Sequence, residues 1–399
     1  MRVLMFGWEF PPYNVGGLGT ACQGLTKALS SKGVDIIFVL PRKVDLNVDY
    51  LKLVYGDEGM EKKVYLVNSL LKAYHSSSSY SESFSSQEKK SINYASDLIS
   101  EVERYASVAG EIARNENFDV IHAHDWLTFK AGMAAKNATG KKLVIHVHAT
   151  EFDRTGGNGV NQYVYDVEKQ GMENADLIIA VSNFTKNKIV DHYGISPEKI
   201  RVVHNAVEFE NYTLEKAHKL KENNKIVLYL GRLTLQKGPD YFVYAAKKVL
   251  EKEPNTIFII AGTGDMERLL IRKVAEMGIS DKVLFTGFLR GDDIHKAYRM
   301  ADVYVMPSVS EPFGITPLES IMNGTPVIIS RQSGVSEVIS HCLKVDFWDV
   351  NQISNKIISL LKYPELHQTM KENGAMEVQK IRWENPAEKC IGIYNEVLV

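Results

Sequence analysis

Apolar runs alternate with amphipathic stretches along nearly the whole chain. In the first half the apolar runs are continuous, and they read RVLMFGW, DIIFVLP, DVIHAH, KLVIHVHA, DLIIAVS and KIRVVHN. Continuous apolar runs are typical of strands in parallel sheets that are covered on both faces. Between them lie helical patterns such as GTACQGLTKALSSKG, which ends at Gly33, a residue type that favours helix C-termini. The first half therefore predicts a parallel sheet flanked by helices.

A second series of apolar runs fills the second half of the chain, namely KIVLYLG, TIFIIAG, KVLFTGF, DVYVMPS and TPVIIS. The polar stretch 207–225 separates the two series and is interpreted as a connector. Two successive series predict an α/β protein with two doubly wound, Rossmann-like domains that face a deep cleft. We expect domains over 1–206 and 207–383, and a terminal helix over 384–399 that returns toward the first domain.

Composition narrows the class of protein. The 47 Lys and Arg against 49 Asp and Glu give a formal net charge of −2, which argues against nucleic-acid binding. The apolar runs stay below the roughly 18 residues of a membrane span, and the start of the chain reads as a buried strand without a leader cleavage pattern. The three cysteines lack CxxC spacing and predict a reduced, cytoplasmic protein. The Ser-rich stretch 75–90 is interpreted as a surface loop.

The turns after the predicted strands hold the candidate ligand groups, because doubly wound sheets bind ligands beyond the carboxyl ends of their strands. The first strand runs into PPYNVGGLGT, where Gly16 and Gly17 open a helix. Glycines there let backbone N–H groups approach an anion at the positive end of the helix. A flexible turn without a ligand explains the same glycines equally well.

The second series opens with YLGRLTLQKG, which places Arg232 and Lys237 five residues apart after a predicted strand. Both could contact one pair of phosphates, Arg232 as a bidentate fork and Lys237 as a point charge. Two solvated cations are the alternative. The GTG turn after the next strand lacks the full GxGxxG fingerprint, and we interpret it as an ordinary turn capped by Asp265.

Two strands of the first half end in histidine pairs, HAH and HVH, and Asp125 follows the first pair. The spacing matches the strand period of two, so the members of each pair share one face of the sheet. We expect no cysteine nearby, and histidines that line a cleft or lie satisfied in the core are favoured over metal ligands. We therefore expect no metal and no cofactor.

The segment SVSEPFGITPLESIMNGTPVIIS holds Glu311 and Glu319, eight positions apart. Thr316, Pro317 and Glu319 fit a capping box, with the threonine before the helix, proline first and glutamate third. This reading explains Glu319 without any ligand. It does not explain Glu311, which lies in the turn before the helix and is predicted to project into the cleft.

The same turn contains a candidate anion site. Gly314, Ile315 and Thr316 would present free backbone N–H groups at the N-terminus of the helix.

Taken together, NVGGL, HAHDW, GRLTLQKG and EPFGITPLE resemble the retaining glycosyltransferases of GT-B architecture, in particular the glycogen and starch synthase-like group. The resemblance spans nearly the full chain and keeps the order of the motifs. It implies transfer of a hexose, glucose above all, from a nucleotide-diphosphate sugar such as ADP- or UDP-glucose to a sugar or α-glucan acceptor. It also implies that no metal is required, because the cations take its place.

The resemblance assigns roles to the candidate residues. Arg232 and Lys237 would neutralise the pyrophosphate of the donor, with help from the backbone of Gly16 and Gly17. The transfer would proceed by attack on the same face of the sugar, through an oxocarbenium-like transition state, after the two lobes close.

Four further residues would contact the substrates. Glu311 would hydrogen-bond the donor sugar near the reacting centre, and Glu319 would bind the ribose hydroxyl groups. His148 would lie beside the donor sugar with its backbone carbonyl near the anomeric carbon, and Asp125 would line the acceptor side.

The chain departs from the group at two motifs. Glycogen and starch synthases carry lysine in a KxGGL motif, and here Asn14 occupies that position. The Gly-Gly pair expected after a later strand reads QSGVSE. Transfer to a small sugar, lipid or glycoside therefore stays open as an alternative acceptor class. A nucleotide-sugar epimerase and a non-catalytic binding protein are alternatives of other classes, whereas a phosphorylase would need a pyridoxal phosphate lysine that has no obvious candidate.

Overall fold

The structure is a computed structural model, and it describes residues 1–12, 16–41, 43, 48–56, 98–157, 159–208, 221 and 223–399. Asn14, the Ser-rich stretch 75–90 and most of the connector over 207–225 lie outside the described residues. The chain forms two compact units. Unit 1 comprises Met1–Glu151, Gly159–Asn205 and Trp383–Val399, and unit 2 comprises Phe152–Asn158 and Ala206–Arg382.

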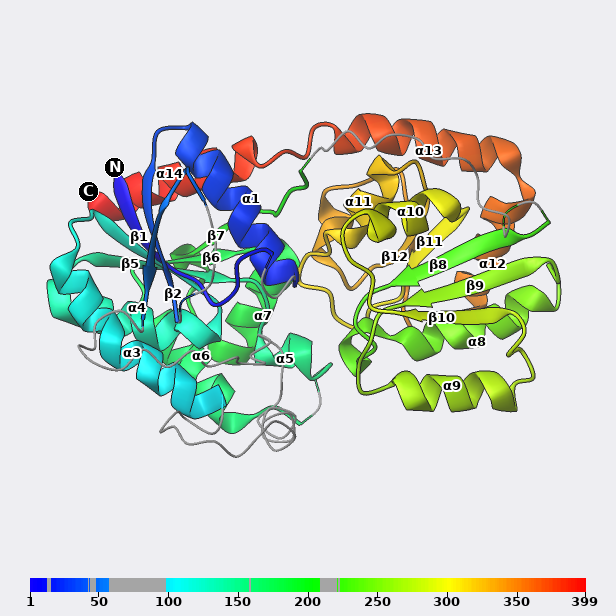
Figure 1. Ribbon diagram of the computed structural model, residues 1–399, viewed down its shortest axis with the longest axis horizontal. Coiled ribbons are helices and arrows are strands. Elements are labelled where there is room, and N and C mark those ends of the chain that lie inside the picture. The colour runs from blue at the N-terminus through cyan, green and yellow to red at the C-terminus, as the bar shows by residue number, and fades with distance from the viewer. Residues whose placement is uncertain are drawn as a thin grey trace. The chain divides into compact units, whose positions relative to one another are not determined.

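Unit 1 is built on a sheet whose seven strands, within the described ranges, are all parallel (Figure 1). The strands are β1 (Arg2–Phe6), β2 (Asp35–Leu40), β3 (Lys52–Tyr55), β4 (Val120–His124), β5 (Lys142–Val147), β6 (Leu177–Ala180) and β7 (Ile200–Val202). Their order in the sheet is β3-β2-β1-β4-β5-β6-β7. The strand order reverses between β1 and β4, which makes the carboxyl ends of these strands the expected ligand position.

Helices cover the sheet of unit 1. They are α1 (Gly17–Ser31), α3 (Leu98–Asn115), α4 (Trp126–Thr139), α6 (Gln162–Asn174), α7 (Asn183–Tyr193), the 3-10 turn η1 (Pro197–Lys199) and α14 (Glu384–Leu398). Helix α1 ends as predicted near Gly33, whose φ of +81° and N–H bond to Ser30 form a left-handed C-terminal cap. The last helix, α14, packs on α1, where Gly24 leaves room for the indole of Trp383.

Unit 2 repeats the architecture with six parallel strands among the described residues. They are β8 (Lys225–Leu230), β9 (Thr256–Ala261), β10 (Val283–Gly287), β11 (Val303–Met306), β12 (Val327–Ser330) and β13 (Leu343–Val345). Their order is β10-β9-β8-β11-β12-β13, so the switch point of this sheet lies between β8 and β11.

The helices of unit 2 bury an apolar core against this sheet. They are η3 (Leu235–Lys237), α8 (Pro239–Leu250), α9 (Glu267–Glu276), α10 (Asp292–Met300), α11 (Thr316–Met322), η4 (Gly334–Glu337), α12 (Val350–Lys362) and α13 (Pro364–Val378). One short helix, α5 (Glu151–Arg154), begins in unit 1 and continues into the segment that belongs to unit 2. The prediction of two doubly wound α/β folds is confirmed.

Candidate functional site

The residues that the sequence predicted for the site fall into two sets, one in each unit. Unit 1 holds Gly16, Gly17, Asp125 and His148, and unit 2 holds Arg232, Lys237, Glu311, Gly314, Ile315, Thr316 and Glu319. Within each unit the set lies beside the switch point of the sheet. The residues of unit 1 follow β1, β4 and β5, and those of unit 2 follow β8 and β11.

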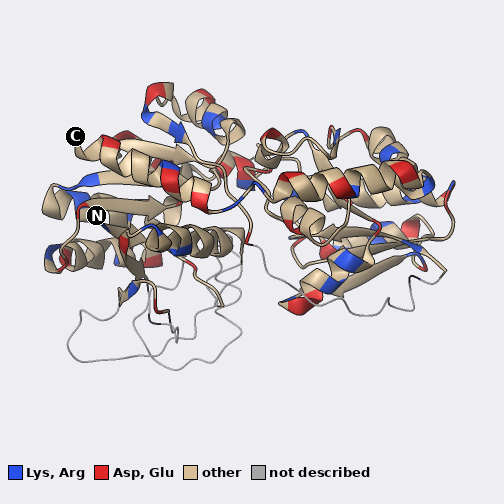
Figure 2. Cartoon of the chain, turned by 90° about the horizontal axis from the view of Figure 1, so that it is seen from above, with Lys and Arg blue, Asp and Glu red and all other residues tan. Residues whose placement is uncertain are grey.

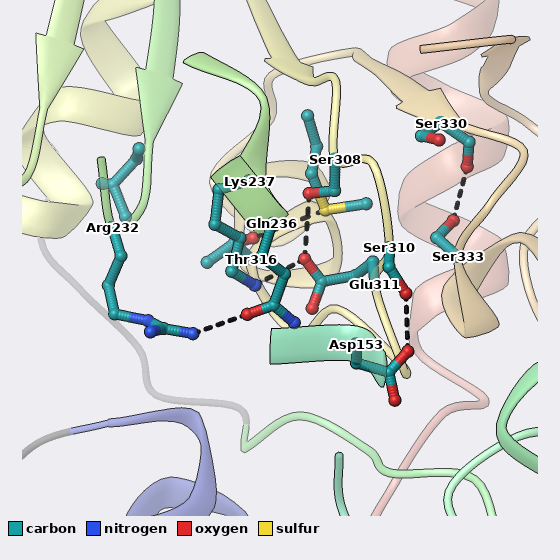
Figure 3. Close-up of polar contacts among 12 residues, drawn as sticks. Asp153, Arg232, Gln236, Lys237, Ser308, Ser310, Glu311, Thr316, Ser330 and Ser333 are labelled. Atoms are coloured by element: carbon teal, nitrogen blue, oxygen red, sulfur yellow. Dashed lines mark hydrogen bonds and ion pairs between the residues drawn. The ribbon is translucent and has the colours of Figure 1, made fainter. Parts of the chain in front are cut away.

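An ion pair between Lys237 and Glu311 lies at the switch point of unit 2 (Figure 3). Lys237 Nζ is 2.5 Å from Glu311 Oε2, and the hydroxyl of Ser308 donates a second hydrogen bond of 3.0 Å to the same oxygen. Glu311 is only 6% exposed and Ser308 is fully buried. A buried carboxylate is costly without partners, so Lys237 and Ser308 together explain how Glu311 is accommodated there.

The two oxygens of Glu311 have different surroundings. Both bonds reach Oε2, and no described residue contacts Oε1 within hydrogen-bond distance. The carboxylate lines a cavity of about 40 Å³ beside Tyr229 and Tyr304. A space of this size has room for a hydroxyl group or a few water molecules beside the carboxylate.

Arg232 is oriented by a neighbour that sequence reasoning missed. Its Nη2 donates to Oε1 of Gln236 at 2.8 Å, as Figure 3 shows. Gln236 is 3% exposed, and its backbone carbonyl accepts the N–H groups of Val309 and Ser310. Gln236 therefore connects the loop after β8 to the turn that carries Glu311. The signal for it in the sequence was its position between the two predicted cations, Arg232 and Lys237.

The GTG turn after β9 supports the Arg232 loop. A side chain at Gly262 would begin 1.9 Å from the carbonyl oxygen of Gly231, and one at Gly264 would begin 2.4 Å from that of Leu233. Glycine is required at both positions because the two loops touch through their backbones. The prediction of a cap by Asp265 is wrong, since α9 begins after Met266 and has no side-chain cap.

The predicted capping box in α11 is also wrong. Thr316 is the first residue of the helix and not its cap, and no side chain caps this end. The Thr316 hydroxyl instead accepts a bond of 2.9 Å from Tyr304, and Glu319 Oε2 accepts one of 3.1 Å from Tyr298. Buried tyrosines from the neighbouring elements outcompete the local cap for these side chains.

Burial changes the proton affinities around α11. It raises the pKa of the Glu319 carboxyl, and the hydrogen bond from Tyr298 partly opposes that rise. Burial likewise raises the pKa of Tyr298 well above its usual value. The backbone N–H groups of Gly314, Ile315 and Thr316 have no acceptor among the described residues.

The α1 end of unit 1 already holds an acidic side chain. Gly16 is the N-terminal cap residue of α1, and a side chain there would begin 2.9 Å from Oε2 of Glu9. Glu9 is 3% exposed. A carboxylate beside the positive end of a helix is favourable, and it is a functional candidate that the sequence reading missed because Glu9 precedes the Pro-Pro turn. A second anion would have to share this helix end with Glu9.

Asp125 and His148 meet at the carboxyl ends of β4 and β5. Asp125 Oδ1 accepts the backbone N–H groups of His148, at 2.6 Å, and Ala149, at 3.2 Å. The His148 ring nitrogen Nε2 lies 2.9 Å from Nδ1 of His124. Burial lowers the pKa of His148 to about 3, so the imidazole is neutral at pH 7.

Four histidines form a stack along β4 and β5. The ring centres of His122 and His124 are 4.2 Å apart, as are those of His146 and His148. Tyr394 of α14 contacts Nδ1 of His122 at 2.7 Å. Burial lowers the pKa of His122 to about 3 and holds those of His124 and His146 well below the usual value.

The histidine stack brings atoms that could bind a metal ion close together. His122, His124 and His146 bring one nitrogen each within 4.8 Å of the others, and Cys22 approaches His124 and His148 similarly. The sequence expectation that no cysteine is nearby is therefore wrong in space. A metal ion must lie in the plane of each imidazole at 2.0–2.1 Å. The rings of His122 and His124 are stacked with 29° between their planes, so an ion bound in the plane of one ring does not lie in the plane of the other.

Charge on the surface is mixed. Figure 2 shows acidic and basic residues interspersed along the helices of both units, in line with the net charge of −2. The three cysteines are free and buried. None of the helices in the described ranges has the length and apolarity to cross a membrane.

Two Rossmann-like units, each with its candidate residues at a topological switch point, define the GT-B class of folds. Solved structures share it: the chain matches sucrose-phosphate synthase from Thermosynechococcus elongatus with a TM-score of 0.76 over 99% of this chain and 98% of that one, at 20% identity. The model for glycosyl transferases group 1 matches residues 211–376, and that for glycosyltransferase family 4 matches residues 88–211.

Two relatives are similar to this chain in sequence over most of its length. An uncharacterised glycosyltransferase of Methanocaldococcus jannaschii is 30% identical over an alignment of 416 positions. The alignment covers 99% of this chain and 98% of the relative. Glycogen synthase of Mycobacterium tuberculosis is 26% identical over 351 residues, 85% of this chain and 80% of the relative. The chain belongs to the group 1 glycosyltransferases, and it is an enzyme that transfers sugars.

Proposed function

We propose that this glycosyltransferase is a retaining hexosyltransferase that moves glucose from a nucleotide-diphosphate sugar, ADP- or UDP-glucose, to a sugar or α-glucan acceptor. The observation that carries the proposal is the buried Glu311 carboxylate, which is held through one oxygen and keeps the other for a ligand. The similarity to a glycogen synthase supports the choice of glucose and of a glucan acceptor.

The donor diphosphate would bind to the cations of unit 2. Arg232 and Lys237 follow β8, and the N–H groups of Gly314 and Ile315 stand at the start of α11. Positive groups here stabilise the charge that develops on the phosphate as it leaves. Lys237 would then share its charge between Glu311 and the phosphate, so donor binding and the orientation of the carboxylate are coupled.

Transfer breaks the bond between the anomeric carbon and the phosphate oxygen. The acceptor hydroxyl oxygen attacks the same face of the sugar, and its proton passes to the departing phosphate oxygen. Glu311 Oε1 would accept a hydrogen bond from a sugar hydroxyl, and the His148 carbonyl would face the positive charge at the anomeric carbon. Glu319, with Tyr298 donating to one of its oxygens, would accept bonds from the ribose hydroxyl groups through the other.

The test begins with a thermal-shift screen of nucleotide sugars, since a ligand that binds only the folded chain raises the melting temperature. The best donor is then incubated with a malto-oligosaccharide, and the new linkage is read by proton NMR. An α-linked product from an α-configured donor is the expected result. A β-linked product, or no transfer from any nucleotide sugar, would overturn the proposal.

Glu311→Gln and Glu319→Gln should differ in that assay. Glu311→Gln is expected to lose turnover while it still binds donor, because the amide is a weaker acceptor for the sugar hydroxyl. Glu319→Gln is expected to bind donor about tenfold more weakly, the equivalent of about 1.4 kcal/mol, with a turnover close to wild type. Donor binding is measured by calorimetry and turnover at saturating donor. Normal turnover of Glu311→Gln would remove its catalytic role.

The second candidate is transfer to a small sugar, lipid or glycoside acceptor. Asn14, in the position where the resemblance expects the lysine of KxGGL, favours it. Small acceptors assayed in parallel with the malto-oligosaccharide distinguish the two candidates.

A further inference from the structure

The backbone at Asp125 is held in an unfavourable conformation. Its φ of +60° makes it the one non-glycine residue with a positive φ among those that the structure describes, and its ψ is 168°. Among the residue types, essentially only glycine adopts this region of backbone dihedral angles without strain. Such strain persists only where the surrounding contacts over-determine it, so the contacts of Asp125 identify what the strain achieves.

Asp125 does not cap its own helix. It occupies the N-terminal cap position of α4, where aspartate usually accepts an N–H group from the first turn, yet no side-chain cap bond forms there. Thr128 N–H and the Thr128 hydroxyl both donate to the backbone carbonyl of Asp125. The Asp125 carboxylate therefore makes no cap bond to α4, and it is directed toward the chain at the end of the neighbouring strand, β5.

The carboxylate continues the ladder between β4 and β5. Asp125 N–H donates to the carbonyl of His146 at 2.9 Å. In a parallel ladder the carbonyl of Asp125 would accept the N–H of His148 next, but that carbonyl has turned into α4. Oδ1 takes its place and accepts the N–H groups of both His148 and Ala149. Asp125 is 2% exposed, so these bonds are shielded from water.

We infer that Asp125 is the positioning residue of His148. By replacing the missing backbone acceptor, its carboxylate fixes the chain one residue beyond the end of β5, where the His148 ring and carbonyl are presented. The His124 ring holds the imidazole of His148 from the other side. The inference rests on the proposed function, in which His148 lies beside the donor sugar, and it gives Asp125 a task other than contact with the acceptor.

Three substitutions at Asp125 separate positioning from stability. Asp125→Ala removes the acceptor and keeps the strained backbone, whereas Asp125→Gly removes the acceptor and relieves the strain. Asp125→Asn keeps one oxygen for the two N–H groups. We expect Asp125→Ala and Asp125→Gly to lose kcat about 100-fold alike, the effect of a misplacement near 1 Å. Asp125→Gly should nevertheless melt at the higher temperature, and Asp125→Asn should recover most of kcat.

Two controls accompany these variants. Asp349 caps α12 in the ordinary way, with a side-chain bond of 2.8 Å to Gln352 N–H. Asp349→Ala should lower the melting temperature and leave kcat unchanged. Binding of the nucleoside diphosphate of the best donor, ADP or UDP, should stay within about twofold of wild type by calorimetry in every Asp125 variant, because the cations proposed to bind the diphosphate are in unit 2.

Hydrogen exchange supplies the direct readout. The amides of His148 and Ala149 should be protected in the wild type and in Asp125→Asn, and should exchange faster in Asp125→Ala. Unchanged protection, a kcat near wild type in Asp125→Ala, or activities that follow the melting temperatures would each overturn the inference. If the wild-type chain transfers sugar from no donor, the proposed function fails, and the exchange rates alone then decide whether Asp125 positions His148.

Discussion

Lys237 and Glu311 form a charge pair in which the partners are unequally buried. The Lys237 side chain is 21% exposed, and the Glu311 side chain is 8% exposed. The lysine can therefore recover water contacts if the pair is broken, and the glutamate cannot. The stability effect of each partner follows from this difference, because an unpartnered buried charge costs more than an exposed one.

Lys237→Ala should destabilise unit 2, by about 1–3 kcal/mol, because it leaves Glu311 with Ser308 as its hydrogen-bond donor. Glu311→Gln should cost less, and the double variant should be more stable than Lys237→Ala alone. Urea unfolding of the two single variants and the double variant measures the coupling. Effects that simply add would show that the pair contributes nothing to stability.

At the scale of elements, the histidine stack makes the β4–β5 pair sensitive to acid. The rings belong to neighbouring strands in register, with His124 opposite His146. Cys22 of α1 and Tyr394 of α14 face the stack, and Asp125 and Glu9 are the carboxylates near Cys22. Each imidazole is neutral in the folded chain, whereas the unfolded chain binds protons near pH 6.5.

Stability should therefore be complete above about pH 6.5 and should fall as the pH is lowered toward 3, since the unfolded state then binds more protons. Each such histidine adds up to about 1.4 kcal/mol per pH unit to the slope. His146→Leu should give a shallower dependence of the melting temperature on pH. Equal slopes in wild type and His146→Leu would contradict the assignment.

The GTG turn gives a second prediction for an element. Gly262 has φ +142°, and a methyl group there would overlap the Gly231 carbonyl. Gly262→Ala should cost about 3 kcal/mol or more, through backbone strain and overlap. Gly392, in α14 with open space around it, is the matched control, because its replacement by alanine should stabilise by about 0.5–1 kcal/mol. Chemical unfolding compares the two, and a tolerated Gly262→Ala would refute the close packing.

At the scale of the whole molecule, the proposed transfer uses protein cations in place of a metal. Chelation of divalent ions should leave turnover within about twofold of its starting value, because Arg232 and Lys237 supply the charge at the phosphate. Initial rates with and without a chelator test this. Activity that disappears in chelator and returns with Mg²⁺ or Mn²⁺ would show that a metal takes part.

Local patterns in the sequence determined the class of fold. The apolar runs became β1, β2, β4, β5, β6 and β7 in unit 1 and β8 to β12 in unit 2. Strands such as β1 and β9 are buried on both faces and must therefore be apolar throughout, whereas exposed residues alternate with others along the edge strand β10. The positions of the motifs in the fold were also predictable. A turn that follows a parallel strand lies at the carboxyl edge of the sheet, whichever strands are its neighbours.

Tertiary structure decided the partners of each side chain. Thr316 and Glu319 match a capping box in sequence, yet they bond to Tyr304 and Tyr298 from elements that precede α11 by many residues. Cys22 is about a hundred residues from His124 and still joins the same cluster. Local rules cannot anticipate such contacts, because a buried polar atom bonds to whatever donor or acceptor the packing brings to it.

Asp125 and Glu311 show most clearly what the sequence determined and what the tertiary structure decided. Their sequence positions, after β4 and after β11, marked them as candidates without any coordinates. Only the folded chain assigned the carboxylate of Asp125 to the N–H groups of His148 and Ala149, and one oxygen of Glu311 to Lys237 and Ser308. Sequence determines which strand a residue follows. Its hydrogen-bond partners depend on which donors and acceptors come within bonding distance when strands and helices pack.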